Sequence, residues 1–260
     1  MKNNFAQAAL VPAGNYIFPY WEDLARDLMA GCPERFLTRL NQPIRVNHHS
    51  TIFILSDICG FTSFCARNSD STEIEISRFL EGFFRMLEDA KKDVWAEGSE
   101  ERDARNNHCD GMPLPRTIKC TGDGLLIQAP NNIKRAFQYT RALLDHYAEY
   151  LSRSGIAAET DVAVGMIRTE KYHEGCVGSD DYRDYTVFSP GLNHLFKAMA
   201  HRPTEHGRSR SHYRTLTIPG DLWKDLPPDW TRGYEIRGRL ECGGISWLRV
   251  ARMKEERLST

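Results

Sequence analysis

The order of the hydrophobic patterns along the chain constrains the fold more than any other feature of the sequence. A strand-like apolar run at 51–56 precedes a pattern over 71–95 in which apolar residues recur at helical spacing. Two short strand-like runs follow within 116–130, and a second helical pattern spans 131–155. A strand with alternating apolar residues then covers 159–169. This order, strand–helix–strand–strand–helix–strand, predicts an α+β fold with a ferredoxin-like core, an antiparallel sheet with flanking helices.

The segments on either side of this core have different expected roles. Residues 1–48 have apolar positions compatible with two short helices, and we expect them to form an N-terminal helical arm. Residues 49–255 are expected to form one larger domain. Its closing strands are expected within 213–227 and 234–250.

Composition narrows the class of protein. Lysine and arginine number 34 and aspartate and glutamate 35, so the net charge of -1 gives no basic field for nucleic acid. No apolar run approaches the ~20 residues of a membrane span, and the N-terminus is too weakly apolar for a secretory signal. The seven cysteines are scattered and odd in number, which favours free thiols. We therefore expect a cytoplasmic protein without nucleic-acid or membrane partners.

Two aspartates form the first candidate site. Asp57 follows the buried run at 51–56, where an unpaired carboxylate costs several kcal/mol. Asp123 lies in the turn Gly122-Asp123-Gly124 of the hairpin. Because the first strand and this hairpin are central neighbours in a ferredoxin-like sheet, both carboxylates are expected at one edge, where two divalent cations would turn their repulsion into a clamp for a triphosphate. The alternatives are an ordinary strand-end cap and an ordinary turn.

A second candidate site lies on the helix expected near the end of 183–202. Ser189 is expected to cap this helix and Pro190 to be its first residue. Asn193 and Lys197 are four residues apart, so they share a face on which an amide and a cation suit a ribose and a phosphate. A solvated polar face is the alternative.

Four motifs in this order carry a family resemblance. They are "FILSDICGFTSF", "IKCTGDGLL", "VAVGMIRTEKYHEGCVGS" and "RDYTVFSPGLNHLFK". Together they resemble the class III nucleotidyl cyclase domain of adenylate and guanylate cyclases over roughly residues 50 to 200. The resemblance implies that residues 49–255 are the catalytic domain and act as a homodimer with active sites at the interface.

The resemblance also implies residue roles. The implied metal ligands are Asp57, Asp123 and the backbone carbonyl of Ile58. The implied triphosphate loop is the backbone of Cys59, Gly60, Phe61 and Thr62. Across the interface, the implied base-selecting pair is Lys119 and Thr186. Asn193 is implied to orient the ribose, and Lys197 stands where the family has a transition-state arginine.

Base preference is inferred from the departures from the family. Lys119 with Thr186 is neither the usual lysine–aspartate pair of adenylate cyclases nor the glutamate–cysteine pair of guanylate cyclases. Phe53 shares a strand face with Leu55 and could occupy space that a purine needs. The "DICGFT" and "SPGLN" motifs are similar to those of the bacterial pyrimidine cyclases of Pycsar antiphage systems. That similarity implies UTP as first choice, CTP second and ATP third.

The expected activity is cyclisation of a nucleoside triphosphate to the 3′,5′-cyclic monophosphate with release of pyrophosphate. The resemblance implies two divalent cations per site, Mn²⁺ or Mg²⁺, and a cyclic-nucleotide product that acts on a separate effector. Lys197 replaces an arginine, for which Arg202 is a further candidate, and a lysine expected late in the domain has no match, with Arg239 and Glu241 found nearby. Two other classes remain open: a non-catalytic nucleotide sensor and an unrelated ferredoxin-like module, for example one that binds RNA.

Overall fold

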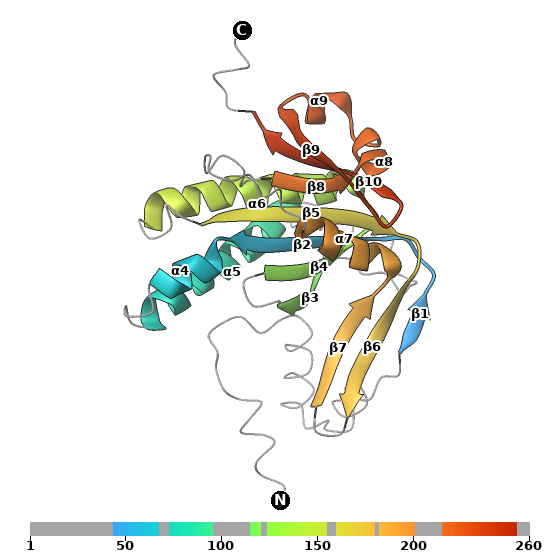
Figure 1. The fold of residues 1–260 in the computed structure, drawn as a ribbon, viewed down its shortest axis with the longest axis horizontal. Coiled ribbons are helices and arrows are strands. Elements are labelled where there is room, and N and C mark those ends of the chain that lie inside the picture. The colour runs from blue at the N-terminus through green and yellow to red at the C-terminus, as the bar shows by residue number, and fades with distance from the viewer. Residues whose placement is uncertain are drawn as a thin grey trace, which may run out of the picture.

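Two sheets and the helices around them make up the described part of the chain, which comprises residues 44–67, 73–95, 115–120, 124–154, 160–179, 182–200 and 215–253 of the computed structural model. The elements are β1 (Arg45–Asn47), β2 (Thr51–Cys59), α4 (Phe61–Arg67), α5 (Glu73–Trp95), β3 (Arg116–Cys120), β4 (Gly124–Pro130), α6 (Ile133–Ser154), β5 (Asp161–Thr169), β6 (Tyr172–Ser179), β7 (Tyr182–Phe188), α7 (Pro190–Ala200), β8 (Thr215–Pro219), α8 (Gly220–Lys224), α9 (Pro228–Thr231), β9 (Tyr234–Cys242) and β10 (Ile245–Arg252). Figure 1 shows their arrangement.

The larger sheet has seven strands in the order β3-β4-β2-β5-β8-β10-β9. Its first four strands are antiparallel neighbours in the ferredoxin-like order, with β2 between β4 and β5. The predicted α+β fold and the expected pairing of the first strand with the hairpin are therefore confirmed. The β5 strand then pairs in parallel with β8, which joins the closing strands to the core.

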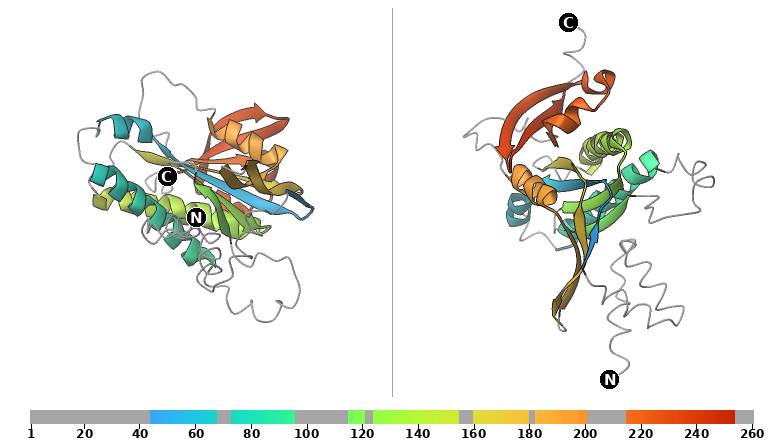
Figure 2. Two further views of the ribbon diagram at one scale, coloured as in Figure 1. Left: turned by 90° about the horizontal axis from the view of Figure 1, so that it is seen from below. Right: turned by 90° about the vertical axis from the view of Figure 1, so that its right-hand side faces the viewer.

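The β2 strand separates two apolar clusters, because successive side chains of a strand point to opposite faces. Ile52, Ile54 and Ile58 face the cluster that the long helices α5 and α6 complete. Phe53 and Leu55 face a second cluster, which is covered by α7. Figure 2 shows α5 and α6 on one side of the sheet and α7 on the other.

Two close approaches fix the helices on the sheet and on each other. A Cβ atom at Gly82 of α5 would lie 2.6 Å from the Tyr150 ring of α6. A Cβ atom at Gly165 of β5 would lie 2.4 Å from Met199 Sδ and 2.7 Å from Leu195 Cδ1 of α7. Glycine at position 165 therefore lets α7 pack directly on β5.

The smaller sheet has the order β1-β6-β7 and extends away from the core (Figure 1). Its first strand lies within the segment expected to be a helical arm, so the last residues of that segment are a strand; 1–43 lie outside the described residues. The reason is a long-range contact: Arg45 Nη2 lies 2.7 Å from Glu174 Oε1 across the β1–β6 ladder. The Glu174 side chain is 4 % exposed, so this ion pair satisfies a buried carboxylate.

Among the cysteines whose side chains the structure describes, Cys59, Cys65, Cys176 and Cys242 form no disulfide bond. Within the part of the chain that the structure describes, no helix combines the length and the apolar character needed to cross a bilayer.

Candidate functional site

Asp57 lies near the end of the central strand, but it does not end that strand. The β2 strand continues to Cys59, because β5 pairs with it as far as Cys59 opposite Asp161. In the other direction, Asp57 is opposite Gly124 of β4. Gly124 directly follows Asp123, which lies outside the described residues. The chain thus brings the half-buried Asp57 beside the start of the strand that follows Asp123.

The loop after Asp57 is a one-residue turn into a helix. Gly60 has a φ of 82°, in the left-handed region that favours glycine, and α4 begins at Phe61. The Phe64 backbone N–H donates to Gly60 O at 2.9 Å. The Phe61 ring stacks on Phe64 and Phe79, with centroids 6.2 and 6.1 Å apart, so its side chain belongs to the core. Of the predicted triphosphate loop, Cys59 is buried, Gly60 and Phe61 are half-buried, and Thr62 is exposed.

A buried hydrogen bond supports the strand end under this loop. The Tyr147 hydroxyl lies 2.9 Å from Thr160 Oγ1, and Asp161 Oδ1 accepts a hydrogen bond from the Val162 backbone N–H at 2.8 Å. Burial raises the pKa of Tyr147 well above its usual value, although the bond to Thr160 opposes this shift. Tyr147 therefore stays neutral at physiological pH and packs as part of the core.

The two residues predicted to select the base lie on strands that contact each other. Lys119 lies on β3 opposite Leu126, which in turn is opposite Leu55 of β2. Thr186 lies on β7, is half-buried, and is opposite Gly175. Since β3 contacts β7, the fold brings these two positions into one region, while the Lys119 side chain lies outside the described atoms.

Phe53 and Leu55 lie in the core of this monomer. Their exposed fractions are 0 % and 4 %. The Phe53 ring meets Tyr172 edge-on at 5.6 Å, and the Tyr172 hydroxyl lies 2.8 Å from His49 Nε2. The contact of Phe53 and Leu55 with the base stays a prediction. The structure shows that Phe53 packs on Tyr172 of β6. Sequence reasoning missed the contact of Tyr172 with His49, because it joins residues that are 123 positions apart in the chain.

Helix α7 presents the second candidate site on its outer face. The Leu192 backbone N–H donates to Ser189 Oγ at 3.0 Å and the helix starts at Pro190, so the predicted cap is confirmed. Asn193 and Lys197 are both exposed. The opposite face is buried on the sheet through Leu192, Leu195, Ala198 and Met199. The two polar side chains therefore share one face that points away from their own sheet.

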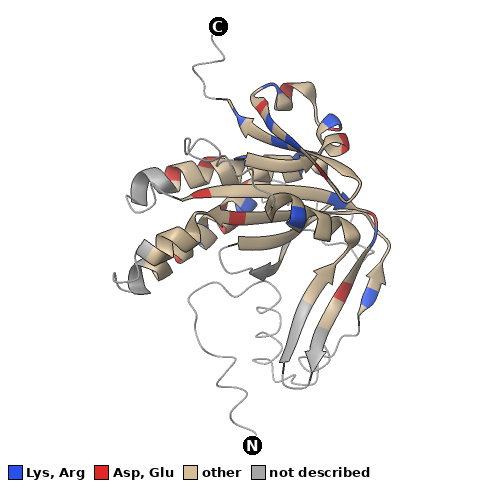
Figure 3. Cartoon of the chain, viewed as in Figure 1, with Lys and Arg blue, Asp and Glu red and all other residues tan. Residues whose placement is uncertain are grey.

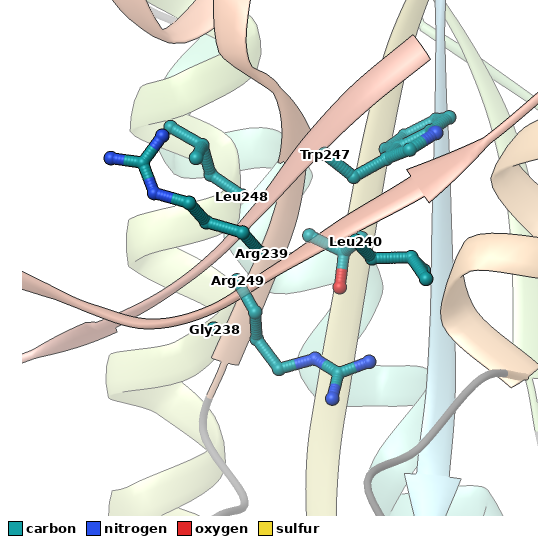
Figure 4. Close-up of a pocket in the computed structure, with 7 residues that line it drawn as sticks. Gly238, Arg239, Leu240, Trp247, Leu248 and Arg249 are labelled. Carbon is teal, nitrogen blue, oxygen red and sulfur yellow. The ribbon is translucent and has the colours of Figure 1, made fainter. Parts of the chain in front are cut away.

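A small pocket of about 180 Å³ lies on the C-terminal strands. Its lining consists of Thr217, Gly238, Arg239, Leu240, Trp247, Leu248 and Arg249. Figure 4 shows the Arg239 and Arg249 side chains directed to opposite sides of the β9–β10 ribbon. Basic residues gather on these strands (Figure 3). None of the predicted site residues lines this pocket.

Within the described ranges, no three histidine, cysteine, aspartate or glutamate side chains lie together as a metal-binding group. The predicted donor set is smaller. It has two carboxylates, of which Asp57 is described, and the carbonyl of Ile58.

Comparisons with known proteins place the fold. No protein-family model matches the sequence, and no curated protein matches it. The adenylyl cyclase CyaB from P. aeruginosa has a TM-score of 0.53 at 13 % identity, over 82 % of this chain and 98 % of that chain. A bacterial light-regulated adenylyl cyclase has a TM-score of 0.55 at 12 % identity, over 93 % of this chain and 67 % of that chain.

A third solved structure is a class III adenylyl cyclase-like ATP-binding protein from Pseudomonas aeruginosa. It has a TM-score of 0.53 at 12 % identity, over 82 % of this chain and 44 % of that chain. At identities this low, the TM-scores establish a shared architecture and nothing further. The chain therefore has the fold of the class III nucleotide cyclase domain.

Proposed function

We propose that this protein is a nucleotide cyclase that converts a nucleoside triphosphate to its 3′,5′-cyclic monophosphate and pyrophosphate. The observation that carries the proposal is the pairing of Asp57 with Gly124, next in sequence to Asp123. Two carboxylates at one sheet edge, beside a glycine turn, are a donor set for a metal-bound triphosphate.

The donors fit hard divalent cations. Carboxylate and carbonyl oxygens are ligands that suit Mg²⁺ and Mn²⁺. We assign Asp57, Asp123 and the Ile58 carbonyl to two such ions, Mn²⁺ or Mg²⁺. When bound, the ions supply acidification of the 3′-hydroxyl and neutralisation of phosphate charge.

The residues of the chain supply orientation and charge. The 3′-oxygen forms a bond to the α-phosphorus, the bond from that phosphorus to the bridging oxygen breaks, and pyrophosphate leaves while water takes the hydroxyl proton. Backbone N–H groups of the predicted loop from Cys59 to Thr62 hold the phosphates. Asn193 orients the ribose, and Lys197 stabilises the charge that builds on the α-phosphoryl oxygens.

The site is assigned to a homodimer. Asn193 and Lys197 are exposed on the face of α7 that points away from its own sheet. That orientation supports their reaching a nucleotide held by the Asp57 of a second copy. Exposed apolar side chains at Val46, Phe188 and Phe196 offer contact area for that copy.

A pyrimidine base is the proposed specificity. A lysine at 119 donates to a carbonyl oxygen, and a threonine at 186 donates or accepts, which suits uracil first and cytosine second. Adenine is the third candidate, and the adenylyl cyclases with this fold support it equally well. The motif similarity to pyrimidine cyclases further supports a cytoplasmic role in antiphage signalling, in which the cyclic product activates a separate effector.

A second candidate function is nucleotide binding without cyclisation. One observation favours it: a solved protein with this fold is described as a cyclase-like ATP-binding protein. Lys197 in place of an arginine points the same way, because a lysine cannot form the bidentate fork on a phosphoryl group.

One experiment separates these proposals. The purified protein is incubated with ATP, GTP, CTP and UTP, singly and mixed, with Mn²⁺ or Mg²⁺, and products are identified by mass and chromatography. We expect a dominant cyclic UMP or cyclic CMP peak. A dominant cyclic AMP peak would keep the activity and overturn the base preference. Tight nucleotide binding with no cyclic product from any substrate would establish the second candidate.

A further inference from the structure

Helix α7 packs against two parts of the fold, β5 and the C-terminal hairpin. Only the β5 side lies within the sequence motifs described above. On its inner side it packs on β5 at Gly165. Its other support is the C-terminal hairpin formed by β9 and β10. Partly buried Leu240, Cys242 and Ile245 of this hairpin join the apolar cluster that contains Leu192 and Leu195 of α7.

The tip of that hairpin meets α7 at one residue. A Cβ atom at Gly243 would lie 2.3 Å from His194 Cδ2 and Nε2 and 2.4 Å from Cε1. Real Cβ atoms do not approach ring atoms this closely, so the His194 ring rests against the Gly243 backbone. His194 directly precedes Leu195 and directly follows Asn193.

The neighbouring glycine provides an internal comparison. Gly243 and Gly244 have φ values of 63° and 73°, so a side chain at either position strains the backbone to a similar degree. A Cβ atom at Gly244 would meet nothing within 4 Å. Of the two glycines, only Gly243 therefore lies against α7.

A second contact joins the hairpin to the end of the helix. Arg249 Nη2 donates to the Ala198 carbonyl at 3.5 Å, a long hydrogen bond. Because the C-terminal end of a helix carries a partial negative charge, a guanidinium there stabilises it.

We propose that the β9–β10 hairpin positions α7, and that Gly243 and His194 are positioning residues for the catalytic face that carries Asn193 and Lys197. This inference rests on the proposed cyclase function for its kinetic consequence. Its structural part does not depend on that function: the contact of Gly243 with the His194 ring fixes the position of α7 along β5. A methyl group at position 243 would overlap the His194 ring, so either the ring turns away or α7 shifts.

The test compares Gly243→Ala with Gly244→Ala in the full chain, and adds His194→Ala alone and in combination with Gly243→Ala. We expect Gly243→Ala to lower kcat about tenfold or more while the KM for nucleotide changes little, since misplacement by about an ångström costs up to about a hundredfold. Gly244→Ala has the same backbone strain without the contact, so its kcat should stay within about threefold of the unmodified protein. The double variant should recover to the level of His194→Ala, because the ring that the methyl group meets is gone.

A structural readout accompanies the kinetics. Hydrogen exchange of the α7 amides, followed by mass spectrometry, should accelerate in Gly243→Ala and return in the double variant. Equal kcat and equal exchange in Gly243→Ala and Gly244→Ala would overturn the inference while the cyclase activity stands. If the unmodified protein makes no cyclic product, the proposed function fails, and the exchange comparison still decides whether the hairpin positions α7.

Discussion

A carboxylate near the end of a strand whose flanking residues are buried needs compensation. Asp57 is half-buried between Ser56 and Ile58, which are both 2 % exposed. An ordinary strand-end cap explains such a residue only if the strand ends there, and β2 continues to Cys59. The extension of β2 to Cys59 therefore argues against a strand-end capping role for Asp57.

Replacing Asp57 by asparagine tests that role at the residue scale. Asp57→Asn keeps the shape but removes the charge, so we expect cyclisation to fall by at least about a hundredfold, because charge compensation by metal is worth several kcal/mol in the transition state. Product formation is measured by chromatography and unfolding by urea titration. Asp229→Asn, which removes an exposed partner of Arg232, is the matched control and should retain full activity. Substantial residual activity in Asp57→Asn would contradict the two-metal assignment.

Tyr234 gives a residue-scale prediction on pH. It packs against Phe137 and Trp223, with ring centroids 5.4 and 5.9 Å away. Burial raises its pKa from 10.0 to about 12, although Arg141 and Arg252 oppose the shift. In the unfolded chain the group loses its proton near the ordinary value, so between these two pKa values the folded state binds more protons.

The direction in which stability changes with pH follows from that difference in bound protons. Tyr234 stabilises the folded state fully below about pH 10 and loses this contribution as pH rises toward about 12. The free energy of unfolding of the unmodified protein should therefore fall more steeply over this range than that of Tyr234→Phe, as measured by urea titration at fixed pH steps. Between pH 8 and about 9.5 the two curves should run parallel, which serves as the internal control. Parallel curves up to pH 12 would show that Tyr234 titrates normally.

At the scale of elements, the packing of α7 on β5 depends on the absence of a side chain. The Gly165 position faces Leu195 and Met199 at distances that leave no room for a methyl group. Both neighbours are buried, so their side chains have little free space into which to turn. The packing of α7, which carries Asn193 and Lys197, is thus coupled to one residue of β5.

We expect Gly165→Ala to lower the free energy of unfolding by about 1–3 kcal/mol, as overpacking of a core does. Gly238→Ala is the matched control, because it also adds a methyl group to a strand but meets nothing within 4 Å. Combining Gly165→Ala with Met199→Ala should cost less than the sum of the two changes, since the second makes room for the first. Urea titration measures the four variants, including Met199→Ala alone, and the unmodified protein. Equal stability of the Gly165 and Gly238 variants would argue against close packing.

At this scale, the sequence predicts those elements that interactions between nearby residues determine. The amphipathic helices, the hairpin strands and the Ser189 cap with Pro190 follow from spacing and capping within a few residues, and the structure confirms them. The β1 strand was missed, because three residues carry no periodicity and Arg45 finds Glu174 only in the folded chain. The contact of Gly243 with His194 was missed for the same reason.

For the candidate site, the sequence predicts which positions come together better than it predicts exposure. The pairing of Asp57 with the start of β4 and the exposed pair on α7 agree with the expected arrangement. The expected contact of Phe53 with the base stays a prediction, and the Phe53 side chain is fully covered in this chain. Burial at that position depends on Tyr172 of β6, whose place over β2 no local pattern indicates.

At the scale of the whole molecule, the described surface has an apolar row on the smaller sheet. Val46, His173 and Phe188 are cross-strand neighbours, and the His173 and Phe188 rings stack with centroids 4.9 Å apart. Val46 and Phe188 are 41 % and 36 % exposed. An exposed row of this kind is typical of a contact surface, which agrees with the proposed homodimer.

Mixing two inactive variants tests whether the site is shared. Asp57→Ala and Asn193→Ala damage different halves, so a heterodimer retains one intact composite site. With random pairing of equal amounts, about a quarter of the unmodified activity should return, since half of the dimers are mixed and each has one intact site of two. The control is the variant that carries both changes in one chain, mixed with unmodified protein, because its mixed dimers hold one defect at each of the two sites. No recovery, with heterodimers shown to form by mass spectrometry, would count against a shared interface.

The parallel ladder between β5 and β8 has a consequence for how the chain folds. It pairs Ala163, Val164 and Gly165 with Thr215, Leu216 and Thr217, and so closes a loop of about 50 residues. Contacts between distant segments form late, because the chain entropy must be lost before they stabilise anything. The β2–β5 ladder of the ferredoxin-like core, in which Ile58 is opposite Val162, closes a longer loop of about 100 residues and meets the same cost. Since α7 packs on β5 and also contacts the β9–β10 hairpin, the face that carries Asn193 acquires its final position only when both of these supports have formed.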